Sequence, residues 1–274
     1  MSISAADVKK LRDTTGAGMM DCKKALTEAN GDFDKAIEIL RKKGQKLSAK
    51  RADRDAKEGV VMAVVSDDKS KGVLVKLSCE TDFVAKNDDF IKFAENIAKI
   101  AIQDLPSKED LLNSKLGDIT VQEKITEQIG VIGEKIELAD YATLKSAMVV
   151  PYIHMGYKAG VIVGLNKAND GFEEAGKDVA MQVAAMRPTA VNKDGVAQEV
   201  IDKELEIGRE IAIKEGKPEH IIDKIAQGKL NKFFKESTLL SQSFVKDSNM
   251  TVEGYLKSID PELTVVDFKH LELG

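Results

Sequence analysis

The segment CETDFVAKN at residues 79–87 decides how the middle of this chain folds, because it joins an apolar stretch to a helical pattern. Residues 73–77, with the sequence VLVKL, are aliphatic and β-branched, which indicates a strand. From Phe90 onward, apolar residues recur at helical spacing, and Asn87 or Asp88 can cap that helix. Phe83 therefore lies at a strand-to-helix turn. Its ring either folds into the core or projects outward, and the pattern alone favours the core.

The composition is typical of a globular protein with two or more modest cores: of 274 residues, 43% are hydrophobic and 32% are charged. The formal net charge of -5 argues against broad nucleic-acid binding, which normally requires a basic excess. We therefore expect a protein partner or a small ligand, and no direct nucleic-acid contact. Cys22 and Cys79 form no CxxC pair, so we expect buried thiols in a reducing cytosol rather than a disulfide or metal ligands.

The N-terminal sequence has neither the apolar segment of a secretory signal nor the Arg-rich amphipathic character of an organellar presequence. No uncharged apolar run approaches the roughly 20 residues that are needed to cross a bilayer. We therefore expect a cytoplasmic protein without a membrane partner.

Residues 1–52 predict a small module of three short helices with a basic linker. Ser4 and Asp7 form a capping-box pattern, and the third helix is expected to stop before Gly44. Residues 41–57 contain eight Lys or Arg against two Asp, which indicates a solvated linker. An RNA contact is the alternative, but this stretch has no aromatic residue on which a base could stack.

The second predicted helix has two different faces. Met20 and Lys23 fall on a different face from Cys22 and Leu26, since neighbours on a helix differ by about 100°. An exposed methionine beside a basic residue suggests a contact surface, because Met adapts its shape to a partner. Alternatively, Met19 caps the core of the module and Met20 is an incidental surface residue. Periodicity alone leaves the two interpretations equal.

Residues 53–146 predict an antiparallel sheet that is covered by helices. Residues 59–65 and 72–77 are strand-like and flank a turn-rich segment, which indicates a hairpin. Two helical patterns follow, and residues 134–139 return as a strand.

Residues 147–187 and 231–274 predict a second unit with the same order of elements, which residues 263–268 close as a strand. The fold class is therefore α+β, with two related subdomains. Residues 188–230 interrupt the second unit with an antiparallel helical hairpin, whose connection is GKP at residues 216–218. A lone hairpin buries little of its apolar stripe, so it needs another surface or another copy of itself.

Sequence motifs of the common catalytic families are missing: we find no P-loop, GxSxG, HExxH, EF-hand or GxGxxG pattern. His154, His220 and His270 are scattered and have no cysteine or carboxylate at ligand spacing. We therefore expect no metal, no cofactor and no enzymatic activity, and interpret His154 as a structural or interface residue. An enzyme that uses Cys79 or His154 is an alternative, although neither forms a nucleophile-and-base pattern.

Two stretches carry a resemblance to a known family. LRDTTGAGMMDCKKAL at residues 11–26, followed by NGD at residues 30–32, resembles the opening of bacterial elongation factor Ts. TDFVA at residues 81–85 resembles the second signature of that family. The two signatures stand in the family's order and separation, and His154 and the closing strand fall where the family places them. The resemblance thus covers essentially the whole chain.

This resemblance implies a guanine-nucleotide exchange factor that binds elongation factor Tu, both GDP-bound and nucleotide-free, and promotes GDP release. In the family, the Asp-Phe of the TDFV signature contacts the GTP-binding domain of Tu. The ring wedges between two helices beside the Mg²⁺ site, a role that carries over to Phe83. The resemblance also implies that the hairpin is a coiled-coil arm for homodimer formation or for contact with Tu. The implied Tu-binding residues are Arg12, Met19, Met20, Lys23, Thr81, Asp82, Phe83, Val84, Ile132, Gly133, His154 and Val245.

Two features depart from the family pattern. Lys246 stands where some members have an apolar residue after Val245, which bears on that contact. The sequence ends at Gly274, soon after the last predicted strand, so we expect the form of the family that lacks the extra C-terminal helical module of longer members. A different function is also open, because the first three helices resemble ubiquitin-associated (UBA) domains as well, and such a module would make the chain a protein-binding adaptor.

Overall fold

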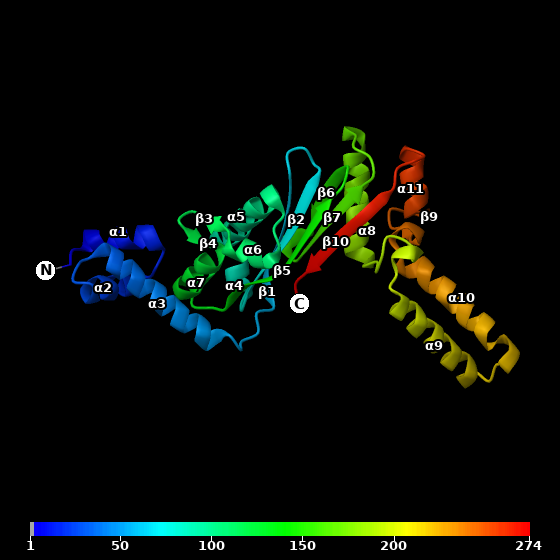
Figure 1. Ribbon diagram of the computed structural model, residues 1–274, viewed down its shortest axis with the longest axis horizontal. Helices are drawn as coiled ribbons and strands as arrows, with labels where there is room; N and C mark the ends of the chain where they lie inside the picture. The colour runs from blue at the N-terminus through cyan, green and yellow to red at the C-terminus, as the bar shows by residue number, and fades with distance from the viewer. Residues whose placement is uncertain (1–2) are drawn as a thin grey trace.

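Two three-stranded antiparallel sheets face each other at the centre of the molecule, and helices cover their outer surfaces (Figure 1). The computed structural model describes residues 3–274. The first sheet has the strand order β1-β2-β5 and the second β10-β7-β6. The strands are β1 (Glu58–Val65), β2 (Lys71–Cys79), β5 (Ile136–Lys145), β6 (Met148–Ile153), β7 (Ala159–Leu165) and β10 (Val265–Glu272). The α+β class and the two predicted pairs of antiparallel strands, β1–β2 and β6–β7, are therefore confirmed.

An apolar layer joins the two sheets. Leu74 and Leu144 of the first sheet form one buried cluster with Val149 and Ile162 of the second. Gly72 allows this close approach, because a Cβ atom there would lie 2.6 Å from Val149 Cγ1. The two helix-covered sheets are thus fixed against one another.

Helices from the middle of the chain cover the first sheet. α5 (Asp88–Asp104) and α7 (Val121–Ile132) bury their apolar stripes against the strands, as their helical spacing predicts. The Asn87 side chain caps α5 by accepting a hydrogen bond from the Asp89 N–H. Between these helices lie three short elements, α6 (Lys108–Asn113), β3 (Lys115–Leu116) and β4 (Ile119–Thr120).

The second sheet is covered by α8 and α11, and a pair of helices projects beside it (Figure 1). α9 and α10 pack along each other, and Gly208 makes this possible, because a Cβ there would lie 2.9 Å from Ala226 Cα. The elements of this part are α8 (Glu173–Met186), α9 (Gln198–Lys214), α10 (Glu219–Ser237), β8 (Ser243–Phe244), β9 (Asp247–Thr251) and α11 (Val252–Ile259). Four short 3₁₀ turns are η1 (Met155–Tyr157), η2 (Asp170–Phe172), η3 (Lys193–Gly195) and η4 (Leu239–Ser241).

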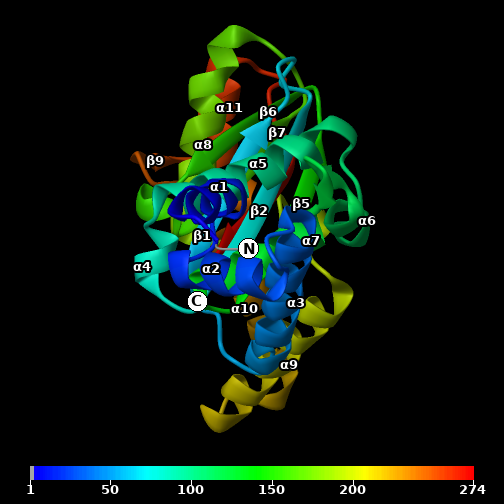
Figure 2. The ribbon, with the colours of Figure 1, turned by 90° about the vertical axis from the view of Figure 1, so that its left-hand side faces the viewer.

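Three helices form the N-terminal module: α1 (Ala5–Thr15), α2 (Met19–Glu28) and α3 (Phe33–Arg51). In Figure 2, which looks from the N-terminal end, they lie in front of the first sheet and its helices. The capping box of Ser4 and Asp7 is confirmed. Across the described residues 3–274, no helix is both long and apolar enough to span a membrane.

The prediction that the third helix stops before Gly44 was wrong. α3 continues through Gly44 to Arg51, so much of the expected linker is helical. Gly44 is buried where α3 crosses α7, and a Cβ there would lie 2.8 Å from the Thr126 carbonyl oxygen. A glycine costs a helix about 1 kcal/mol relative to alanine, and close packing against α7 offsets that cost.

Candidate protein-docking site

Phe83 lies on a single helical turn, α4 (Asp82–Ala85), that follows β2. The Thr81 side chain caps this turn by accepting a hydrogen bond from the Val84 N–H at 3.5 Å. Ala85 is buried, and Val84 packs partly into the core. Since neighbours on a helix differ by about 100°, this arrangement turns Phe83 away from the core. Its side chain is 84% exposed, so the interpretation that the ring is buried was wrong.

Asp82 presents a charge beside this ring. Its carboxylate forms an ion pair with Lys86 one turn later, at 2.6 Å. The hydrogen bond from Lys86 lowers the pKa of Asp82, which keeps the carboxylate ionised at neutral pH. The turn therefore offers a partner an apolar ring and an anion next to each other.

Glu134 supports the turn from the other side. Its Oε2 accepts the backbone N–H groups of Glu80 at 3.1 Å and Thr81 at 3.0 Å, and its Oε1 accepts the Thr81 hydroxyl at 2.6 Å. Glu134 follows Gly133, which ends α7 in the left-handed conformation at φ +84°. These bonds bring the predicted residues Ile132 and Gly133 close to α4. No sequence pattern indicated Glu134, because it lies 53 residues from Thr81.

Glu80 ties the same junction to the N-terminal module. Its carboxylate accepts hydrogen bonds from Arg51 at 2.6 Å, Arg54 at 3.0 Å and the Lys135 N–H at 2.6 Å. The Glu80 side chain is only 13% exposed. Burial by itself would raise the pKa of Glu80, but the Lys135 N–H and the two guanidinium groups outweigh it and lower the pKa to about 2. Glu80 is therefore an ionised, nearly enclosed link between α3 and α4.

We expect Glu80→Gln to destabilise the chain by about 1 to 2 kcal/mol at neutral pH, because charged hydrogen bonds become neutral ones. A lowered folded-state pKa contributes stability that is complete above the ordinary value of 4.5 and is lost as the pH falls toward 2. The difference in unfolding free energy between wild type and variant should therefore shrink below about pH 4.5. Urea denaturation over this range measures it. Glu253→Gln, which breaks an exposed pair, is the matched control.

A second apolar surface lies on the N-terminal module. Met19 is 55% exposed and Met20 65%, while α2 buries Cys22 and Leu26 on its opposite face. The alternative that Met19 caps the core was therefore wrong. Arg12 and Lys23 are exposed on the same module. Figure 1 shows this module at one end of the molecule, so its exposed apolar surface is separate from that of α4.

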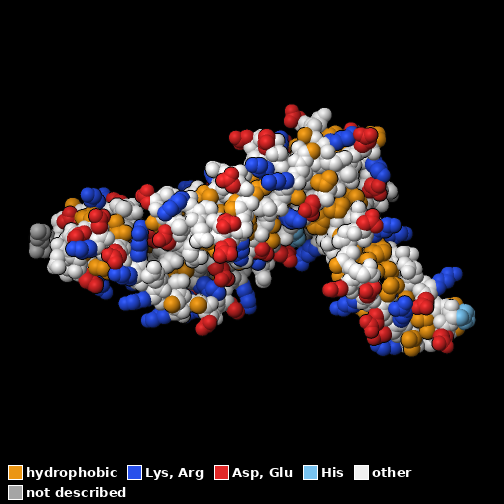
Figure 3. Space-filling view, viewed as in Figure 1, with side chains coloured by type: hydrophobic (Ala, Val, Ile, Leu, Met, Phe, Trp, Pro, Cys, Tyr) orange, Lys and Arg blue, Asp and Glu red, His pale blue; other side chains and the backbone are white. Residues whose placement is uncertain are grey.

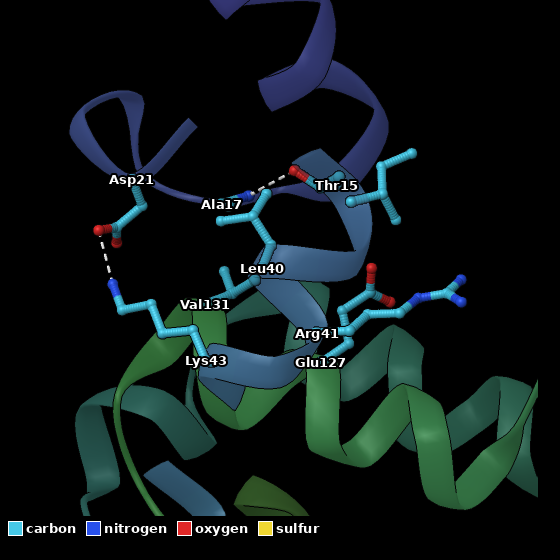
Figure 4. Close-up of a pocket in the computed structure, with 10 residues that line it drawn as sticks. Thr15, Ala17, Asp21, Leu40, Arg41, Lys43, Glu127 and Val131 are labelled. Atoms are coloured by element: carbon cyan, nitrogen blue, oxygen red, sulfur yellow. Dashed lines mark hydrogen bonds and ion pairs between the residues drawn. The ribbon is translucent and has the colours of Figure 1, made fainter. Parts of the chain in front are cut away.

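The N-terminal module is held on the body by α7. Figure 4 shows the pocket between them, which Ala17 and Leu40 line from the module and Val131 lines from α7. An ion pair of 2.6 Å joins Asp21 of α2 to Lys43 of α3 beside this pocket. The module and the body therefore share an interface in addition to the covalent connection.

His154 and Val245 line one groove of about 490 Å³ beside the second sheet. His154 Nδ1 lies 3.1 Å from the Tyr152 hydroxyl. The Val245 N–H donates to the buried Gln182 side chain at 2.8 Å, and the Val245 side chain is 49% exposed. Two of the predicted residues that are distant in sequence thus meet here.

Lys246 turns away from Val245 and pairs with Asp178 of α8 at 2.6 Å. The Asp178 carboxylate also accepts the Tyr255 hydroxyl at 2.9 Å and is almost fully buried. The lysine at this position therefore anchors the backbone next to Val245. Val245 itself remains 49% exposed beside it.

The structure gives Cys79 the properties of a core residue. Its side chain is fully buried, and its thiol donates to the Thr81 carbonyl at 3.2 Å. Burial, together with the nearby charge of Glu134, raises the pKa of Cys79 to about 12. A thiol with this pKa is protonated at neutral pH and is a poor nucleophile, which argues against the enzyme alternative at this residue.

A family model described as elongation factor TS matches residues 80–274. Relatives named elongation factor Ts occur in Christiangramia forsetii, at 57% identity over 99% of this chain and 99% of the relative, and in Amoebophilus asiaticus, at 54% identity over 100% of both. The relative of that name from Chlorobaculum tepidum is 45% identical over 99% of both chains. With such identity along its full length, the chain belongs to the elongation factor Ts family.

Proposed function

We propose that this chain is the guanine-nucleotide exchange factor of elongation factor Tu: it binds Tu·GDP and promotes GDP release during translation elongation. One observation carries the proposal: in a member of this family, the ring of the TDFV signature, Phe83, is 84% exposed on a capped turn. Nucleotide exchange makes or breaks no covalent bond of the nucleotide, so the chain needs no catalytic group. The cytoplasm, where translation takes place, is its expected location.

Phe83 acts as the wedge. In the family resemblance it enters between two helices of the GTP-binding domain of Tu beside the Mg²⁺ site, with Asp82 as its polar companion. Thr81 and Val84 hold the turn, while Ile132 and Gly133 contribute the neighbouring surface. Burying one Phe side chain contributes roughly 1.5 to 3 kcal/mol, which can hold a displaced helix but cannot by itself release a tightly bound nucleotide. Further contacts are required.

Two more surfaces supply these further contacts with Tu. The N-terminal module offers Met19 and Met20, whose flexible side chains can adapt to a protein surface, flanked by Arg12 and Lys23. The groove with His154 and Val245 offers a concave site next to the second sheet. Contacts spread over three surfaces of one molecule can stabilise a nucleotide-free conformation that a single contact could not.

Nucleotide release follows from linkage. A partner that binds nucleotide-free Tu more tightly than Tu·GDP must weaken the affinity of Tu for GDP by the same factor, at about 1.4 kcal/mol for each tenfold. By the same reciprocity, GTP binding displaces the exchange factor. The chain therefore acts by stabilising one state of its partner.

Mixing the chain with Tu that carries labelled GDP tests this function. We expect GDP release to become faster as the concentration of the chain rises, and to saturate when all Tu is bound. Release that stays at the intrinsic rate of Tu at every concentration would exclude the exchange function. Bovine serum albumin at equal concentration controls for nonspecific effects.

We also propose the domain organisation that the sequence predicts: a UBA-like module at residues 1–52, an N-subdomain at 53–146, a C-subdomain at 147–187 with 231–274, and a hairpin at 188–230. Family membership does not favour the ubiquitin-binding adaptor. For the hairpin, Ile207 and Ile213 are exposed apolar residues of α9. Figure 3 shows hydrophobic side chains interspersed with charged ones along the projecting pair of helices. They support self-association as a homodimer, which sedimentation at increasing concentration would detect.

A further inference from the structure

Phe83 lies on a short helical element that is not stable by itself. α4 spans four residues, and a single helical turn is unstable in isolation, because forming the first turn fixes several residues for few hydrogen bonds. Ala85 is buried and Val84 is only partly buried, so the hydrophobic core supports this turn from one side. The fixed orientation of the ring therefore needs another source.

We propose that Glu134 and Glu80 are positioning residues that hold the Phe83-bearing turn in its docking orientation, and that Arg51 joins this turn to the N-terminal module. The proposal rests on the proposed function, because it assigns these residues to the wedge. None of the three is required to touch Tu. They act through the backbone at residues 80 and 81 and through the Thr81 hydroxyl.

Glu134 determines which way the Thr81 hydroxyl points. Because that hydroxyl donates its proton to Glu134 at 2.6 Å, its lone pairs are free to face α4. One of them accepts the Val84 N–H and so closes the cap of the turn. The other carboxylate oxygen of Glu134 holds the two amides that precede α4. A single side chain thus fixes both the entry of the turn and its cap.

Glu80 extends this support to α3. Arg51 is the last residue of α3, and its guanidinium meets the Glu80 carboxylate at 2.6 Å, while the Glu80 amide is held by Glu134. The module that carries Met19 and Met20 is therefore connected to the wedge through side chains as well as through α7. A preorganised pair of surfaces loses less conformational entropy when it binds, which raises affinity without a new contact.

The test compares Glu134→Ala with Glu137→Ala in the full chain. Glu137 is a nearby carboxylate that pairs with Lys135 and forms no hydrogen bond or ion pair with α4. For Glu134→Ala we expect amide hydrogen exchange at residues 81–85 to become at least about tenfold faster, with residues 161–165 of β7 unchanged. GDP release from Tu at subsaturating concentrations of the chain should be at least about tenfold slower. Glu137→Ala should match wild type in both measurements.

Glu134→Gln is the second variant. The glutamine side chain has one carbonyl oxygen, which can accept only part of the hydrogen bonds that the carboxylate accepts, so we expect intermediate values in both measurements. Unchanged amide exchange in residues 81–85 of the alanine variant would overturn the proposal, even if GDP release slowed, because Glu134 would then act as a direct contact. Faster amide exchange throughout both sheets in Glu134→Ala and in Glu134→Gln would also overturn the proposal, because Glu134 would then stabilise the whole fold rather than this turn. If wild type itself failed to speed GDP release, the proposed function would fall, while the amide measurement would still decide whether Glu134 positions the turn.

Discussion

Phe83→Ala is expected to reduce the acceleration of GDP release by about 10- to 150-fold at subsaturating concentrations of the chain. This factor corresponds to the roughly 1.5 to 3 kcal/mol that burial of one Phe side chain contributes, if most of it is gained when the ring enters Tu. The stability of the free chain should not fall, because the ring is 84% exposed and leaves no cavity when it is removed. Loss of function without loss of stability is the signature of a contact residue.

Two measurements check this prediction: release of labelled GDP from Tu, and thermal unfolding of the free chain. Ile259→Ala is the matched control, since Ile259 is also a large apolar residue, 40% exposed, but lies at the end of α11, outside the proposed contact surfaces. We expect this control variant to accelerate GDP release from Tu as much as wild type does. A Phe83→Ala variant as active as wild type would show that the ring is not the wedge, whatever its exposure.

Local signals in the sequence predicted most of the fold. The β1–β2 hairpin follows from aliphatic runs around a turn-rich segment, and α5 follows from its apolar spacing and the Asn87 cap. The end of α3 was predicted wrongly, because Gly44 looks like a helix stop until its packing against α7 is known. A glycine needed for close approach and a glycine that ends a helix look the same in one sequence.

Residues of the candidate site could be predicted only where the family resemblance supplies them. Phe83 was identified through the TDFV resemblance, whereas the pattern alone placed the ring in the core. Its exposure depends on the cap at Thr81 and on Glu134, which are joined across 53 residues of chain. Lys246 likewise could not be interpreted before its pairing with Asp178 was known. Side-chain partners so far apart leave no periodic trace in the sequence.

The crossing of α3 and α7 determines where the N-terminal module lies. A Cβ at Gly44 would lie 2.8 Å from the Thr126 carbonyl oxygen, and a Cβ at Gly130 would lie 3.0 Å from Gly44 Cα. Both obstacles are backbone atoms, which cannot rotate away as a side chain can. A larger residue at Gly44 must therefore push the two helices apart.

Gly44→Val is expected to detach the N-terminal module without unfolding either sheet. Overpacking a contact of this kind costs about 1 to 3 kcal/mol. Separation of the two helices would remove the contacts around the pocket between the module and α7, and would strain the Arg51–Glu80 pair. Cleavage by a protease at residues 52–57 should become about 10- to 100-fold faster, since the open population rises with this cost. GDP release at subsaturating concentrations should slow as well, because Met19 and Met20 would no longer be fixed relative to Phe83.

Limited proteolysis and the GDP-release assay measure these two effects, and Gly228→Val supplies the control. Gly228 lies within α10, and a Cβ there meets nothing within 4 Å, so the same substitution tests valine in a helix without the crossing. Equal cleavage rates in both variants would mean that α3 tolerates separation from α7. If Gly44→Val were cleaved faster but released GDP at the wild-type rate, the module would contribute no binding energy. If both effects appear together, the placement of the module by α3 contributes to exchange, and the two apolar surfaces work as parts of one rigid body.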